Sequence, residues 1–116
     1  MAQDARQVFV DRVKSIDPLF RRGDLERFWP ELRRLMDLAS DREDVSMKKS
    51  HYLASLAARS LARSDPDSAR EFLDLADRTI NPVHMTPYLV EERREFRKMT
   101  EAALASMGES RRREDR

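Results

Sequence analysis

The sequence predicts an all-α fold of about five helices, packed as a helical bundle. Apolar residues recur at spacings of three and four along most of the chain, which is the period of one face of an α-helix. No run of alternating β-branched residues is present and only two glycines occur, so strands have almost no support. Prolines that follow Asp, Asn or Thr mark several of the expected helix boundaries.

The first two helices are expected in the N-terminal third of the chain. The first runs from Asp4 to about Ile16 and ends before Pro18, because proline interrupts the hydrogen bonds of a helix interior. Gly23 and Asp24 then form a turn and an N-cap for the second helix. The expected apolar faces are Ala5, Phe9, Val13 and Ile16 in the first helix and Leu25, Phe28, Trp29, Leu32, Leu35, Met36 and Ala39 in the second.

The second helix continues to Ser40 and contains Pro30, so we expect either a kink or a short first turn at that proline. A polar segment, 40–44, separates it from a third helix over about 45–63. This third helix is apolar on two sides. One stripe is Tyr52, Leu53, Leu56, Ala57 and Ser60, and the other is Met47, His51, Ala54, Ala58 and Leu61. The helix is therefore either the centre of the bundle or has one face left for a partner.

Two pairs of residues begin the last two helices. Asp65 and Pro66 open a fourth helix, because the carboxylate caps free N–H groups and proline needs no donor there. Thr86 and Pro87 open a long fifth helix in the same way, and Gly108 is suited to close it. The inner face of the fourth helix is expected to be Ala69, Phe72, Leu73, Ala76 and Ile80.

Length and composition indicate one small domain. In a chain of 116 residues, we expect residues 1–108 to form a single helical domain and 109–116, which are nearly all charged, to be disordered. Charged residues make up 39% of the chain, so narrow apolar stripes on charged helices must supply the core. Cysteine is absent, and charges interrupt every apolar run among the first twenty residues. We therefore expect a cytoplasmic protein without a membrane span.

Residues suited to catalysis or metal binding are scarce. The two histidines, His51 and His84, fall in different elements and show no metal-binding spacing. Cysteine nucleophiles are absent, and two isolated glycines cannot form a phosphate-binding loop. Paired carboxylates such as Glu91 and Glu92 lie in charge-dense runs typical of a solvated face. We expect no enzyme and no cofactor; an enzymatic alternative would need a polar pocket around His84 or buried carboxylates.

Basic and acidic residues are balanced, with 23 Lys and Arg against 22 Asp and Glu, so the chain has no global field of either sign. Acidic neighbours cancel most of the field of the arginines at 111–113. Two other basic pairs could contact phosphates, and they are Arg21 with Arg22 and Lys48 with Lys49. A nucleic-acid-associated subunit of a nucleoprotein assembly, held by these two pairs, is therefore the leading alternative to protein binding.

Residues 51–82 read HYLASLAARSLARSDPDSAREFLDLADRTINP and contain two amphipathic helices joined by a short turn. The stretch resembles a single tetratricopeptide-type hairpin. Ser60 departs from the aromatic residue that the family prefers, Asn81 stands where it prefers proline, and no copy occurs 34 residues before or after. With Ala69 aligned on the family's invariant small residue of the second helix, the positions that agree in character are Leu53, Leu56, Ala57, Leu73 and Ala76. The resemblance implies a tetratricopeptide-like fold, with an orthogonal bundle as the other arrangement.

In that family the first helix of each hairpin lines a groove, and the resemblance places four residues there: His51, Ala54, Ala58 and Leu61. They belong to the second apolar stripe of the third helix, although a central bundle helix would show the same two faces. We expect a non-enzymatic protein-binding module: an adaptor, chaperone-like or complex-scaffolding protein that holds a peptide or helix of a partner. The surplus apolar face also predicts self-association as a homodimer.

Overall fold

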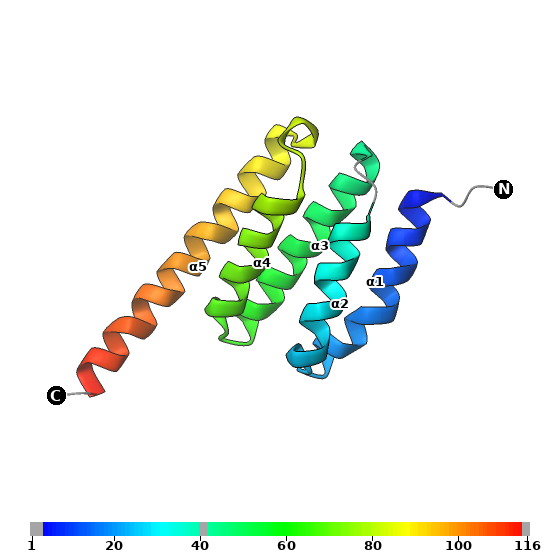
Figure 1. Cartoon of the computed structure of the whole chain (residues 1–116). Coiled ribbons are helices and arrows are strands. Elements are labelled where there is room, and N and C mark those ends of the chain that lie inside the picture. Colours follow the sequence, from blue (N-terminus) through cyan, green and yellow to red (C-terminus); the bar gives the residue numbers. More distant parts are fainter. Residues whose placement is uncertain (1–3, 40–41, 115–116) are drawn as a thin grey trace. The chain divides into compact units, whose positions relative to one another are not determined.

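The computed structural model describes residues 4–39 and 42–114 (Figure 1). These residues form five α-helices and one short 3-10 helix, and they contain no strand. The predicted all-α fold of about five helices is confirmed. The helices are α1 (Ala5–Arg21), α2 (Leu25–Leu38), α3 (Glu43–Ala62), α4 (Pro66–Thr79), η1 (Pro82–His84) and α5 (Pro87–Glu114).

The chain divides into two compact units, unit 1 (Met1–Lys49) and unit 2 (Ser50–Arg116). Unit 1 contains α1, α2 and the first turns of α3, and unit 2 contains the rest of α3 with α4, η1 and α5. This division differs from the single compact domain expected over residues 1–108. Close packing of α1 on α2 and of α4 on α5 gives each unit a core of its own. Across the described ranges, no helix is both long and apolar enough to cross a membrane.

In unit 1, α1 does not end before Pro18 as predicted but continues to Arg21. Proline removes one hydrogen bond from a helix interior, which weakens the helix locally. Tertiary packing offsets that loss, because Phe20 is buried and its ring centroid lies 5.3 Å from that of Phe28 in α2. The buried apolar side chains of this unit are Phe9, Ile16, Phe20, Phe28, Leu32, Leu35, Met36 and Val45.

Capping residues begin the helices largely where the sequence predicts. The carboxylate of Asp24 accepts a hydrogen bond from the backbone N–H of Arg27, and that of Asp65 accepts one from Ser68. Gly23 has a φ of 77°, so the predicted turn before α2 uses the left-handed region that glycine tolerates. α2 runs through Pro30 to Leu38; the predicted boundary residue Ser40 lies outside the described residues.

In unit 2, α5 does not end at Gly108 but continues to Glu114. Disorder predicted for 109–114 is therefore corrected to helix, while 115–116 lie outside the described residues. Glycine costs only about 1 kcal/mol in a helix interior, and the neighbouring Glu and Arg residues are good helix formers. α5 has 28 residues and α4 has 14, and the C-terminal half of α5 extends past the start of α4 (Figure 1).

Candidate binding groove

A groove of about 780 Å³ lies in unit 2, where the end of α4, η1 and the first half of α5 meet. Its apolar lining residues are Pro82, Met85 and Val90. Its charged lining residues are Asp77, Arg93, Arg94, Arg97, Lys98 and Glu101. The groove therefore combines an apolar floor at the η1 end with charged walls along α5.

The apolar end of the groove is exposed because the chain changes direction there twice. The side chain of Asn81 accepts a hydrogen bond from the N–H of Val83 at 3.0 Å and starts η1. The hydroxyl of Thr86 accepts one from the N–H of Leu89 at 3.2 Å and starts α5. Between these two caps Val83 is left 85% exposed. Val83 is the most exposed large apolar side chain of the described residues, and it follows the lining residue Pro82 in sequence.

A network of ion pairs joins α4 to α5 along one side of the groove. Arg93 contacts Asp77 with an Nη1–Oδ1 distance of 2.6 Å. Arg97 contacts Asp77 at 2.9 Å and Asp74 at 3.1 Å. Arg93 also approaches the thioether sulfur of Met85 at 3.3 Å. These arginines are thus partly neutralised by α4, and they hold α5 in place beside the groove.

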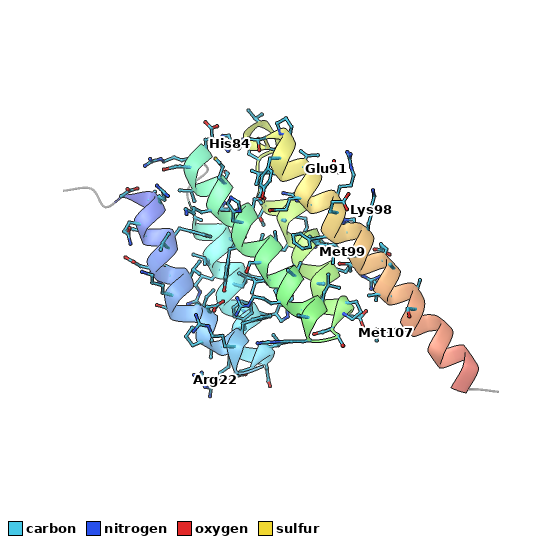
Figure 2. All side chains as sticks on the ribbon, turned by 180° about the vertical axis from the view of Figure 1, so that it is seen from behind. Arg22, His84, Glu91, Lys98, Met99 and Met107 are labelled. Atoms are coloured by element: carbon cyan, nitrogen blue, oxygen red, sulfur yellow. The ribbon has the colours of Figure 1, made fainter. Side chains whose placement is uncertain are left out.

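Arg94 and Lys98 are more exposed than Arg93 and Arg97, the two arginines that pair with α4. Arg94 is paired with Glu91 at 3.0 Å, and Lys98 is paired with Glu95 at 3.6 Å. All four side chains are well exposed, and exposed pairs of this kind contribute at most about 1 kcal/mol. Arg94 and Lys98 are therefore free to exchange their intrahelical partners for an anion in the groove. Lys98 and Met99 leave α5 on different sides (Figure 2).

The residues predicted to line a groove on the third helix do not form one open face. His51 is exposed, Ala58 and Leu61 are partly buried, and Ala54 is only 8% exposed. The assignment of Ala54 to a partner surface is corrected for this reason, because its short side chain is covered by the rest of the chain. Across the whole stripe, Ala54 is buried, Met47, Ala58 and Leu61 are partly buried, and His51 is exposed.

The four residues predicted to contact phosphates also differ in their exposure to solvent. Arg21 is exposed but pairs with Asp17, with an Nε–Oδ2 distance of 2.8 Å. Arg22 is exposed in the turn after α1 (Figure 2) and Lys48 is partly buried. Lys49 is only 3% exposed, so its assignment as a phosphate contact is corrected. It follows Val45 by one helical turn, which puts it on the covered side of α3.

No group of three or more His, Asp or Glu side chains is placed to hold a metal ion within the described ranges. His51 lies on α3 and His84 lies in η1. The carboxylate of Asp77, which lines the groove, and that of Asp74 both form ion pairs with Arg97. These ion pairs connect α4 to α5.

Sequence reasoning missed the groove, although part of its signal was present. Asp74 and Asp77 are three residues apart, and Arg93 and Arg97 are four residues apart, so each pair shares one helix face. Opposite charges in matching pairs on consecutive helices are typical of an interhelical network. A second signal was Val83, an apolar residue in the short segment between the two predicted helices, where exposure to solvent is expected.

Comparison with known protein families, curated proteins and solved structures finds no match to this chain. The hairpin that resembles the tetratricopeptide family corresponds to the second part of α3, a turn at 63–65 and α4. Membership of that family stays a prediction.

Proposed function

We propose that the chain is a cytoplasmic, non-enzymatic protein-binding module, an adaptor, chaperone-like or complex-scaffolding protein that also self-associates. One observation carries this proposal: large apolar side chains of unit 2 are exposed on η1 and on two sides of α5, and one of them, Val90, lines the groove. Four of the five large apolar side chains that are exposed among the described residues lie on η1 or α5, namely Val83, Tyr88, Val90 and Met99, and the fifth is Val8 in α1. Exposed apolar surface on a monomer is a frequent feature of protein interaction sites.

The apolar residues of α5 fall on two sides of that helix. At 3.6 residues per turn, Val90 points to the groove side, whereas Tyr88 and Met99 share the opposite side. Tyr88 is 67% exposed and Met99 is 54% exposed. We assign self-association to this second surface, the Tyr88–Met99 edge, and partner binding to the groove. A symmetric dimer would bury the same edge of both copies.

Light scattering of the purified, nucleic-acid-free protein at low and high salt tests the self-association. We expect a mass of twice 13.7 kDa for the wild type and of 13.7 kDa for Met99→Glu. The matched control is Val90→Glu, which adds the same charge at a similarly exposed apolar position on the groove side and should stay dimeric. A wild type that is monomeric at every concentration would remove self-association from the proposal.

The nucleic-acid alternative is supported by the exposure of Arg21 and Arg22 at the end of α1. It is weakened by the burial of Lys49 and by the ion pair between Arg21 and Asp17. A mobility-shift assay with a labelled duplex and a labelled single strand at low salt distinguishes the two. Binding that falls steeply with salt would favour the alternative, and no shift at low salt would remove it.

A further inference from the structure

The α5 wall of the groove is long enough to contact a helix of a partner. Its α5 wall consists of residues that recur at spacings of four, four and three, namely Val90, Arg94, Lys98 and Glu101. These positions form one continuous edge of α5, about 16 Å long at 1.5 Å per residue. The walls of the groove are helices whose backbone groups are already paired, so a partner must be recognised through side chains. A helix of about three turns matches this edge.

The charges that face the groove are predominantly positive. Four cations line it, against the two carboxylates of Asp77 and Glu101. Asp77 is already shared between two arginines of the interhelical network. Glu91 and Glu95, the intrahelical partners of Arg94 and Lys98, are not among the lining residues. A ligand in the groove therefore meets Arg94 and Lys98 directly, while the carboxylates that pair with them do not line the groove.

The apolar lining residues of the groove favour a protein over a nucleic acid as its ligand. Pro82, Met85 and Val90 lie together at the η1 end of the groove, and a phosphate backbone offers nothing to cover them. An amphipathic helix offers apolar side chains at spacings of three and four and carries charges on its flanks. One amphipathic helix can therefore cover the apolar lining residues and also form ion pairs with the cations of α5.

We propose that this groove receives an amphipathic helix of a partner protein whose flank is acidic. Its apolar side chains cover Pro82, Met85 and Val90, and its carboxylates pair with Arg94 and Lys98. This inference rests on the proposed function, because it names the chemistry of the partner that the module holds. Carboxylates of the partner replace Glu91 and Glu95 as the contacts of the two cations, which costs little because those pairs are exposed.

Two fluorescein-labelled synthetic peptides of about 16 residues test the proposal by fluorescence anisotropy with the full chain. Both carry leucines along one helical face; one has glutamates on its flanks and the other has lysines. We expect the glutamate peptide to bind, and Arg94→Glu combined with Lys98→Glu to weaken it about tenfold or more. The same double variant should bind the lysine peptide more tightly than the wild type does. High salt should weaken the wild-type complex.

A second double variant, Arg70→Glu with Arg78→Glu, is the matched control. It makes the same change in net charge at exposed positions of α4 that do not line the groove, and it should leave both affinities unchanged. Val90→Glu should weaken the glutamate peptide, whereas Met99→Glu, on the other side of α5, should not.

The proposal is overturned if the glutamate peptide does not bind, if both peptides bind equally, or if the two double variants weaken binding equally. It is also overturned if a single-stranded DNA oligonucleotide binds more tightly than the glutamate peptide and loses that binding in the groove variant. Light scattering on the same samples separates this failure from failure of the proposed function. If the wild type is a dimer, Met99→Glu is a monomer and the glutamate peptide does not bind, then the proposed self-association is supported. Only the inference of an acidic partner helix is then overturned.

Discussion

Ser60 lies in α3 with a side chain that is only 1% exposed, and its hydroxyl has no hydrogen-bond partner among the described residues. A buried hydroxyl without a partner loses its hydration and gains nothing in return. We expect Ser60→Ala to raise the free energy of unfolding by up to about 1 kcal/mol in urea denaturation. Ser15→Ala, at an exposed serine of α1, is the control and should change little. If Ser60→Ala destabilises the protein, the Ser60 hydroxyl forms a hydrogen bond in solution.

Ala54 provides a second test at the scale of single residues. Because Ala54 is only 8% exposed, Ala54→Glu would place a carboxylate at a position largely shielded from water. We expect a loss of about 3 kcal/mol or more of folding free energy, seen by circular dichroism during urea unfolding. His51→Glu, one turn earlier at an exposed position, should stay within about 0.5 kcal/mol of the wild type. A folded Ala54→Glu protein of wild-type stability would restore the partner-surface assignment of this residue.

At the scale of elements, the two glycines make a matched pair. A methyl group added at Gly108 meets no atom within 4 Å, and this residue lies inside α5. We expect Gly108→Ala to raise helix content and to stabilise α5 by about 0.5–1 kcal/mol. Gly23→Ala should destabilise the protein instead, because φ there is 77° although the space around it is equally open. Thermal unfolding followed at 222 nm compares them; stabilisation by both substitutions would contradict the assigned backbone conformations.

The contact between α4 and α5 can be measured by a double-mutant cycle on Asp77 and Arg97, each replaced by Ala. Their 2.9 Å ion pair is partly shielded and belongs to a network, so we expect a coupling free energy of about 0.5–1 kcal/mol. The reference cycle on Glu91 and Arg94, an exposed pair within α5, should give a smaller value of about 0.2–0.5 kcal/mol. Equal couplings would mean that the interhelical network contributes no more than a surface pair.

Helix starts could be predicted from the sequence more reliably than helix ends. A cap such as Asp24 or Asp65 acts within three residues, so local sequence contains the whole signal. The ends of α1 and α5 depend on more than their breakers: packing of Phe20 offsets Pro18, and good helix formers around Gly108 outweigh it. The groove could not be predicted, because it exists only where α4, η1 and α5 meet.

The whole molecule has two local cores, and its unfolding can show whether they act together. Trp29 is the only tryptophan and lies in unit 1, so its fluorescence reports that unit, whereas circular dichroism at 222 nm reports both. We expect Phe72→Ala, a cavity in the core of unit 2, to lower the midpoint seen by circular dichroism more than that seen by fluorescence. Coincident midpoints in the wild type and in the variant would instead support the single domain expected over residues 1–108.

The uneven length of α4 and α5 has a consequence for the timescale of local opening in unit 2. α5 is about 42 Å long and α4 about 21 Å, and none of residues 101–108 is fully buried. Backbone amides of the first turns of α5 should therefore exchange with deuterated solvent slowly, and those after Thr100 progressively faster. A ligand that seats between Val90 and Glu101 would slow exchange only in the first half of the helix. Exchange rates along this one helix would thus separate occupancy of the groove from contacts made by its C-terminal half.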